Sequence, residues 1–260
     1  MGCVTISTVS TLVLQMIRHS TVKIFTRPSS LWGGWNVGKK FQFLAFVPVN
    51  HNYQNSDDGI AKLTGLGDAT VLANYKLIDE SSVGSQGSLF SQQLWVGGGV
   101  KLNTGKFDIE NGAADIAAAA NRQLGSGSID LLLNAIYNVQ IDKFGISTTA
   151  SYKINSANKY QYRFGDKLSA SSFVYYPISV PNVLISPNLG ILYEKTQPSE
   201  LQNSKIDLTA GTILEGSVGL EISFNKTTFG FSAQLPLAQN FAENQTHSRV
   251  KGMAHMSFAF

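Results

Sequence analysis

The feature of this chain that most constrains its fold is a period of two in the polarity of its side chains. In residues 144–155, FGISTTASYKIN, apolar side chains such as Phe144 and Ile146 alternate with polar ones such as Ser147 and Lys153. Successive side chains of a β-strand point to opposite faces, so this pattern predicts a strand with one apolar and one polar face. The same pattern recurs in four later segments: 183–194, 210–224, 227–237 and 249–260.

Strand-like segments fill most of the chain, and their connections alternate between short and long. About twelve segments fit a strand: 5–17, 22–37, 39–49, 67–79, 91–103, 127–140, 143–155, 160–178, 182–196, 209–224, 226–237 and 249–260. Tight turns are expected near 38–39, 141–143, 179–182 and 225–226, and long polar loops at 50–66, 104–126, 197–208 and 238–248. The connection 80–91 is an exception, because it is long where the alternation requires a tight turn. Helical spacing is confined to 113–124, an alanine-rich insert that we expect to form a short helix.

Composition indicates where such strands would lie. Charged residues make up 14% of the chain, against about 25% in average soluble proteins. No uninterrupted apolar run reaches the roughly 18 residues of a transmembrane helix. Long strands of alternating polarity, with short turns at one end and long loops at the other, are typical of outer-membrane β-barrels. A sheet that faces lipid must also close on itself, because its edge backbone groups would otherwise lack hydrogen bonds.

We therefore predict an all-β fold, a membrane-spanning antiparallel up-and-down β-barrel of about twelve strands. It would form a single domain over residues 1–260, with the insert 113–124 as a candidate plug of a narrow channel. A soluble β-sandwich is the alternative, but its outward face should carry Lys, Glu and Thr. The second face of nearly every strand here is instead Gly, Ser or Asn. Aromatic residues near strand ends, including Trp35, Tyr162 and Tyr176, fit the girdles of a membrane barrel.

The two ends of the chain carry separate expectations. Residues 1–21 lack the basic start and cleavage site of a secretory signal peptide, so we expect a trimmed or misassigned N-terminus. Cys3 is the single cysteine, which excludes an intramolecular disulfide. The C-terminal Phe260 is the residue through which we expect the outer-membrane assembly machinery to recognise the chain. The net charge of +3 is too small and too scattered for a nucleic-acid partner, so outer-membrane lipid and a small-molecule solute are the expected partners.

Two glycine motifs could suggest phosphate binding. GLGDATVLANYKL (65–77) and GSGSIDLLLNAIY (125–137) each place glycines and an acidic residue directly before a strand. A dinucleotide site needs such glycines between a strand and a helix, so that the helix N-terminus meets the phosphates. Both motifs instead follow a long loop, and their glycines are interpreted as bends at the barrel rim. In the first motif, Asp68 is then predicted to face the lumen and Tyr75 the membrane.

The sequence gives little support for catalysis. The four histidines are His19, His51, His247 and His255, and no local motif joins one of them to a serine and an acid. A barrel lipase would need its serine and histidine on the lipid side, whereas strand parity places His255 inside. No cluster has metal-ligand spacing, and NSDDG (55–59) fits a solvated turn better than a calcium loop. We expect no enzyme activity, no metal and no cofactor.

Charged side chains on the predicted inner faces are the candidate functional residues. Charged residues in a lumen can determine the selectivity of a pore, or they can form structural ion pairs across the barrel. The sequence does not distinguish these two roles. Strand parity assigns these residues to the lumen: Asp68, Lys76, Lys101, Asp130, Lys153, Arg163, Lys167, Glu194, Glu215, Glu221, Arg249, Lys251 and His255.

Four motifs in a fixed order carry a resemblance to a known family. The motifs are GLGDATVLANYKL, GGGVKLNTGKF (97–107), GSGSIDLLLNAIY and YRFGDKLSASSFVYY (162–176). Over residues 31–260 the chain resembles the outer-membrane transporter-like barrels of the meta-pathway of phenol degradation family. Asn103 stands where that family usually has proline. The resemblance implies a bacterial outer-membrane channel for the passive uptake of small, mainly hydrophobic compounds.

Two other functions remain compatible with a membrane barrel. One is an outer-membrane enzyme of the lipase or protease type. The other is a closed barrel that acts as a structural or adhesion protein through loops 50–66 and 104–126.

Overall fold

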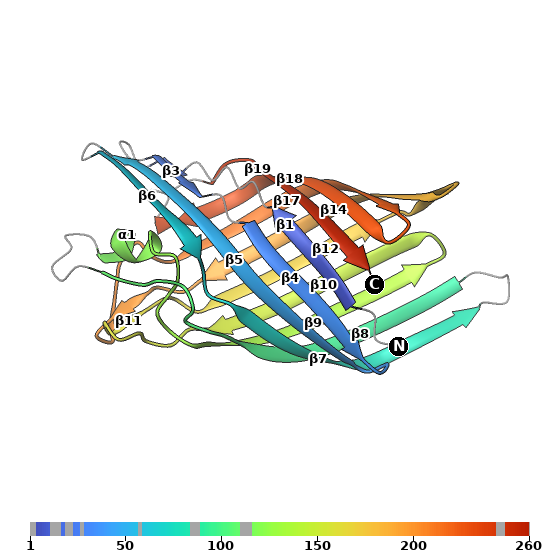
Figure 1. Cartoon of the computed structure of the whole chain (residues 1–260), viewed down its shortest axis with the longest axis horizontal. Coiled ribbons are helices and arrows are strands. Elements are labelled where there is room, and N and C mark those ends of the chain that lie inside the picture. Colours follow the sequence, from blue (N-terminus) through green and yellow to red (C-terminus); the bar gives the residue numbers. More distant parts are fainter. Residues whose placement is uncertain are drawn as a thin grey trace.

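Twelve strands of the chain pair side by side in an unbroken circuit. A computed structural model describes residues 4–10, 17–18, 23–26, 29–56, 59–83, 89–109, 116–242 and 248–259. The circuit runs β1–β4–β5–β7–β8–β9–β10–β12–β14–β17–β18–β19 and returns to β1, and every neighbouring pair is antiparallel. The strands run obliquely, and the front and back walls slope in opposite directions (Figure 1). The predicted all-β, up-and-down antiparallel barrel is confirmed.

Each predicted segment overlaps one strand of the barrel wall. The wall strands are β1 (Val4–Ser10), β4 (Ser29–Val37), β5 (Phe41–Ser56), β7 (Thr70–Val83), β8 (Leu89–Lys101), β9 (Asp130–Ile141), β10 (Phe144–Ile154), β12 (Lys167–Tyr175), β14 (Val183–Thr196), β17 (Gly211–Phe224), β18 (Thr227–Phe241) and β19 (Lys251–Ala259). Shorter strands lie beside the wall or at its end: β2 (Ile17–Arg18), β3 (Lys23–Thr26), β6 (Gly59–Leu66), β11 (Tyr162–Arg163), β13 (Ile178–Val180), β15 (Glu200–Leu201) and β16 (Ser204–Lys205).

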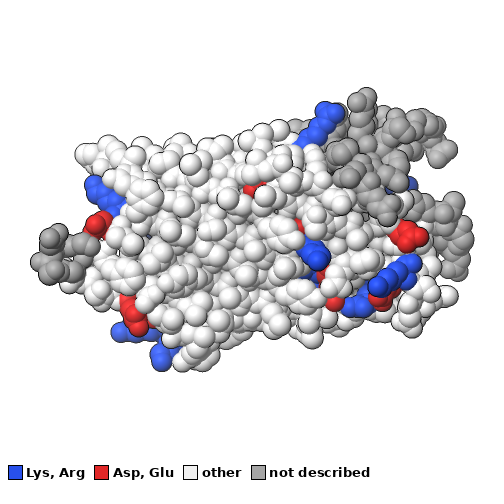
Figure 2. Space-filling view, turned by 180° about the vertical axis from the view of Figure 1, so that it is seen from behind, with Lys and Arg blue, Asp and Glu red and all other residues white. Residues whose placement is uncertain are grey.

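The two faces of the wall differ as the alternation predicts. On β9, Leu131, Leu133 and Tyr137 are exposed on the outer face, whereas Asp130 and Asn134 lie on the inner face and are buried or half-buried. Large exposed apolar residues also line the outer faces of the other strands, among them Leu189, Val218 and Phe231. Charged side chains gather toward the two ends of the molecule, and the surface between them is mostly uncharged (Figure 2). This is the surface that a lipid bilayer requires of a barrel.

One end of the barrel carries the short turns. These turns use residues with positive φ, including Gly38, Asp142, Asn182 and Asn225, because such backbone suits the tight hairpins that join twisted strands. The exceptional connection 80–91 is mostly strand. The pairing of β7 with β8 extends to Val83 and Leu89, and the turn itself lies outside the described residues.

The opposite end carries the long connections, and one of them differs from its prediction. Residues 50–66 do not form a loop. The second half of β5 pairs with β6 from Val49 to Ser56, which makes a hairpin that extends beyond the barrel wall. The period of two continues there, but the segment is polar enough to resemble a loop in the sequence.

A small folded unit, which we call the cap, covers part of the long-loop end. It comprises residues 102–109, 116–129, 155–166 and 197–210, and contains α1 (Ile116–Asn121) and the sheet β11–β15–β16. The helix expected within 113–124 is therefore present, and it lies at this end of the barrel (Figure 1). The apolar side chains of the cap form their own core: Phe107, Ile109, Ala119, Ala120 and Tyr162, with Ile116, Tyr160, Phe164, Leu201 and Ile206 packed against them.

The cap corrects two predictions made from residues 160–178. The wall strand begins only at Lys167, and Tyr162 and Arg163 pair with Glu200 and Leu201 inside the cap. Tyr162 is 1% exposed, so it belongs to the core of the cap and not to an interfacial girdle. Trp35 and Tyr176 are exposed on the outer face near the short turns, as a girdle requires.

Some predictions concern residues beyond the described part of the chain. Cys3, His19, His247 and Phe260 are among them. Within the described residues, no helix has the length and apolar character needed to cross a membrane.

Candidate functional site in the barrel lumen

Three of the predicted lumen residues meet at the long-loop rim. Lys101 Nζ lies 2.7 Å from Asp68 Oδ2 and 2.8 Å from Asp130 Oδ2. All three side chains are buried, and Asp130 is fully so. We call Asp68, Lys101 and Asp130 the rim cluster. Its two carboxylates exceed its single ammonium group by one negative charge, so the remaining carboxylate lone pairs need other donors.

Backbone and side-chain groups of the cap supply those donors. Asp68 Oδ1 accepts a hydrogen bond from Gly105 N at 2.9 Å, and Asp68 Oδ2 accepts from Ser126 N at 2.7 Å and Ser126 Oγ at 2.8 Å. Burial by itself raises the pKa of Asp68, but the hydrogen bonds from Lys101, Ser126 and Gly105 outweigh it and hold the pKa below its ordinary value. Asp68 is therefore an ionised anchor for two segments of the cap.

Asp130 joins the rim cluster to a further cap segment. Its Oδ1 accepts hydrogen bonds from Ser128 Oγ at 2.8 Å and from Ser156 N at 3.0 Å. Its Oδ2 has no hydrogen-bond partner and meets Lys101 Nζ as an ion pair. Segments 102–109, 116–129 and 155–166 thus all attach to one buried charge cluster.

The glycines of the two motifs make this attachment possible. A Cβ on Gly125 would lie 2.4 Å from Asp68 Oδ1, and one on Gly105 would lie 2.7 Å from Gly125 Cα. A Cβ on Gly67 would lie 2.6 Å from Asn50 Nδ2. Of the motif glycines, Gly127 also has a positive φ of 69°. These glycines allow close packing at the rim, Gly125 and Gly105 directly beside Asp68, which the interpretation as rim bends described only in part.

Farther along the lumen, inner-face charges pair either between neighbouring strands, as β12 and β14, or across one intervening strand, as β19 and β17 across β18. Lys251 Nζ lies 2.8 Å from Glu215 Oε1, and Lys167 Nζ lies 2.5 Å from Glu194 Oε2. Lys153 is the register partner of Lys167 and has no hydrogen-bond or ion-pair partner in the described part of the chain.

A weaker pair lies toward the short-turn end. His255 Nε2 is 3.8 Å from Glu221 Oε1, and the imidazole ring lies over Gly230. Most charges predicted for the lumen are therefore held in pairs, which favours the structural alternative for those residues. Their role in lining a pore stays a prediction.

Two residues assigned to the lumen by parity lie elsewhere. Arg163 belongs to β11 in the cap, where it makes two hydrogen bonds to the Asp166 carboxylate, at 3.0 and 3.1 Å, and one to Glu200 at 3.3 Å. Arg249 precedes β19 and is exposed. Parity assigned them wrongly because it applies only within a wall strand, and both residues lie outside one.

Conversely, parity missed Asp79. A register shift between Lys76 and Ile78 turns the strand, so Asp79 pairs with the inward-facing Gln93. Lys76 Nζ then lies 2.9 Å from Asp79 Oδ2 and 4.8 Å from the centre of the Trp95 ring. The bulge shows in the sequence only as a change of phase, because the adjacent apolar residues Leu77 and Ile78 separate Lys76 from Asp79, and strict parity overlooked it.

A row of four side-chain amides spans five adjacent strands of the inner wall, from β9 to β4. Asn134 Nδ2 donates to Asn74 Oδ1 at 2.9 Å, Asn74 Nδ2 donates to Gln42 Oε1 at 3.2 Å, and Gln42 Nε2 donates to Asn36 Oδ1 at 3.3 Å. The row passes over β8 at Gly97, where a Cβ would lie 2.1 Å from Asn74 Oδ1. These residues, which we call the amide row, were not predicted to act together.

Beside the amide row the inner wall is apolar. Trp32 and Phe46 are register partners on β4 and β5, and their rings stack at 6.0 Å between centroids. Leu44 lies over Gly34 on the same two strands. The lumen therefore presents an aromatic and aliphatic strip as well as polar groups.

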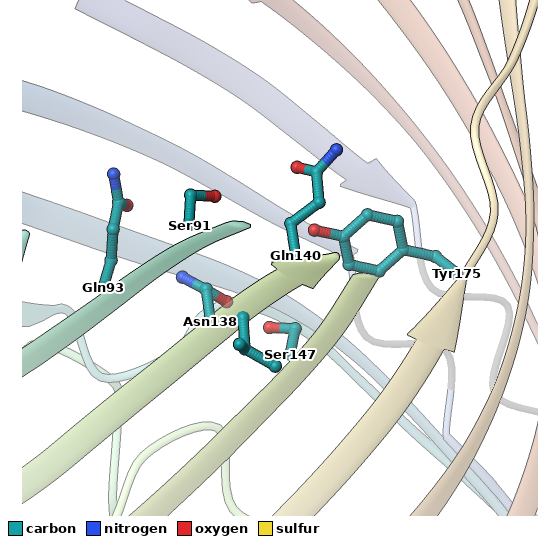
Figure 3. A pocket seen from close by; sticks show the side chains of 7 residues that line it. Ser91, Gln93, Asn138, Gln140, Ser147 and Tyr175 are labelled. Carbon is teal, nitrogen blue, oxygen red and sulfur yellow. The ribbon is translucent and has the colours of Figure 1, made fainter. Parts of the chain in front are cut away.

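At the short-turn end the inner wall carries a half-open cavity of about 370 Å³. Its lining contains no charged residue: Ser91, Gln93, Asn138, Val139, Gln140, Ser147 and Tyr175. Figure 3 shows the Tyr175 ring directed across the wall toward Gln140, with the serines and amides around it. We call this region the exit pocket. No group of three or more His, Cys, Asp or Glu suited to a metal ion occurs among the residues that the structure describes.

Comparison with known proteins identifies the fold. The chain matches no protein-family model and no curated protein. Among solved structures, an outer-membrane channel from Pseudomonas putida F1 superposes with a TM-score of 0.66 at 14% identity, covering 100% of this chain and 94% of that one. The β-domain of the Bordetella autotransporter Brka superposes with a TM-score of 0.50 at 11% identity, covering 100% and 99%. These similarities show the fold of outer-membrane β-barrel proteins.

Proposed function

We propose that this protein is a channel of a bacterial outer membrane that mediates passive uptake of small, mainly hydrophobic solutes. The observation that carries the proposal is the closed circuit of twelve strands with an apolar outer face and a mixed lumen. A barrel with a purely structural role would be expected to fill its lumen with paired charges and packed side chains. Here the lumen also holds the Trp32–Phe46 strip and the exit pocket.

The hydrophobic solute class rests on two supports. The resemblance to the meta-pathway of phenol degradation family implies it, and the Trp32–Phe46 strip offers aromatic surface inside the barrel. Aromatic rings contribute large apolar contact area with little loss of side-chain entropy. We further propose that the barrel performs no reaction, an expectation that the inward position of His255, over Gly230 and beside Glu221, supports.

Reconstitution in liposomes tests the channel. The purified protein should admit small aromatic and aliphatic solutes faster than protein-free vesicles do. Trp32→Gln should slow the uptake of apolar solutes, because it replaces aromatic surface in the lumen with an amide. Trp35→Gln is the matched control, since Trp35 lies three residues away on the outer face and is 56% exposed. Absence of both solute flux and planar-bilayer conductance would overturn the proposal.

A further inference from the structure

The exit pocket is built by the register of four adjacent strands. One row of register partners contains Gln93, Asn138 and Ser147, on β8, β9 and β10. The next row toward the short turns contains Ser91, Gln140, Gly145 and Tyr175, the last on β12. All the side chains of both rows point into the lumen, so they form one continuous surface.

Gly145 determines where the Tyr175 ring lies. A Cβ on Gly145 would lie 2.0 Å from Tyr175 Cζ, so the ring occupies the space that any other residue would fill. Phe173, the corresponding residue of the first row, leans the other way and lies over Gly190. The pocket is therefore left open above Ser147 and bounded on one side by the Tyr175 ring (Figure 3).

Most hydrogen-bonding groups of the pocket are unused. The side chains of Ser91, Asn138, Ser147 and Tyr175 have no hydrogen-bond partner among the described residues. Gln140 donates through Nε2 to Asp142 O at 3.0 Å, and Gln93 donates through Nε2 to Asp79 Oδ1 at 3.0 Å. The oxygens of both glutamines remain available as acceptors. The lining thus offers both donors and acceptors to a bound molecule.

The charge of the lining restricts what can bind. A charged solute would find no counter-ion, because the adjacent Asp79 is already paired with Lys76 at 2.9 Å. A hydrocarbon would displace water from the serines and amides without replacing its hydrogen bonds, and each such loss costs affinity. The cavity of about 370 Å³ lies within the range of small-ligand sites, roughly 300–1,000 Å³.

We propose that the exit pocket binds a small, uncharged, ring-shaped solute that carries several hydroxyl groups, such as a methyl glycoside. The amides and serines bond the hydroxyl groups, and the Tyr175 ring packs against the apolar face of the solute ring. The inference rests on the proposed function and deepens it. It adds the requirement that a transported solute also carries several hydroxyl groups that the exit pocket can bind. Solutes that satisfy both the Trp32–Phe46 strip and the exit pocket combine an apolar portion with neutral hydroxyl groups.

Calorimetric titration of the purified full chain tests this assignment. The protein is kept in a detergent without a sugar headgroup, and the probes are a methyl hexoside, the corresponding hexuronate, an amino sugar and cyclohexanol. The methyl hexoside should bind saturably, and the other three probes should bind at least about tenfold more weakly. The hexuronate and the amino sugar would find no counter-ion in the pocket, and cyclohexanol would form several fewer hydrogen bonds.

Variants identify the pocket as the binding site. Asn138→Ala should weaken binding of the methyl hexoside about fivefold, and Gly145→Ala should do so by displacing the Tyr175 ring. Tyr176→Phe is the matched control, because Tyr176 is the next residue and lies on the outer face, 39% exposed. Heat-modifiable migration of each variant on a gel shows that its barrel is folded.

The outcomes separate this inference from the proposed channel. Equal binding of all four probes, no binding of the methyl hexoside, or an unchanged affinity in Asn138→Ala would each overturn the assignment of the pocket. Binding in detergent requires no flux. Liposomes without flux, combined with saturable binding that Asn138→Ala weakens, would therefore reject the channel and keep the pocket.

Discussion

Replacing Asp68 with asparagine should release part of the cap from the barrel rim. The Asp68 carboxylate accepts four hydrogen bonds, one from Lys101, one from Gly105 and two from Ser126. Asparagine keeps a single acceptor oxygen and directs its amide donors toward groups that are themselves donors. It also leaves Lys101 with Asp130 as its remaining carboxylate partner.

The size of the effect follows from burial. Removing one partner of a buried, hydrogen-bonded ion pair costs about 3–5 kcal/mol. The lower part of this range applies here, because the asparagine oxygen still accepts one hydrogen bond. If the free energy for opening segment 102–129 falls by about 3 kcal/mol, the open form becomes about a hundredfold more populated.

Limited proteolysis measures that population. Lys106 and Arg122 are exposed trypsin sites within the segment, and cleavage tracks the open form when opening and closing are fast. Cleavage at these sites should accelerate about a hundredfold in Asp68→Asn while the barrel itself remains resistant. Asp108→Asn is the matched control, since Asp108 lies in the same segment and its side chain accepts one hydrogen bond, from Tyr160 at 2.8 Å. Wild-type cleavage rates in Asp68→Asn would refute the assignment of the rim cluster as the anchor of the cap.

Three further predictions test the rim cluster and the outer wall. Because the folded-state pKa of Asp68 is lowered, its contribution to cap stability is fully present above the unfolded-state pKa of about 3.9 and is lost as pH falls through the folded-state value. Hydrogen exchange of residues 102–109 should therefore show opening of the cap only in acid. The same opening between pH 5 and 8 would contradict this prediction. Gly125→Ala should accelerate trypsin cleavage about as much as Asp68→Asn, because the new Cβ would lie 2.4 Å from Asp68 Oδ1 and 2.6 Å from Gly105 O; unchanged cleavage would show that the rim tolerates a methyl group. Val218→Arg should lower the temperature at which the barrel unfolds on a heat-modifiability gel, because an arginine near the middle of a lipid-facing strand costs about 2–4 kcal/mol. Val218→Ala, the control, should have little effect on that temperature. Equal unfolding temperatures of the two variants would argue against a lipid-facing outer wall.

The wall of the barrel was predictable from the sequence because each of its strands obeys one local rule. Leu131 and Leu133 are exposed and Asp130 is buried because they alternate along β9, and no knowledge of distant residues is needed. The same rule placed Lys101, Glu215 and Lys251 on the inner face. It could not show that Lys101 lies between the carboxylates of Asp68 and Asp130, because that arrangement depends on how three strand ends meet at the rim.

The cap was not predictable for physical reasons, and the bulge shows in the sequence only as a change of phase at Leu77 and Ile78. Ser126 donates to Asp68 across 58 residues of sequence, and no periodic pattern records such a contact. Arg163 lies in a segment that reads as one strand, but residues 164–166 interrupt it, and Arg163 pairs with Glu200 in a different sheet from β12. Asp79 faces inward because of a single extra residue in β7.

The amide row gives the lumen wall an electrical direction. All three hydrogen bonds of the row run in the same direction, from β9 toward β4, so the amide dipoles add head to tail. The row begins at Asn134 Oδ1, a buried oxygen with no hydrogen-bond partner. Hydrogen bonds in such a chain polarise one another. A molecule with its own dipole would therefore contact this wall more favourably in one orientation than in the reverse, and a channel of the kind proposed above would favour that orientation.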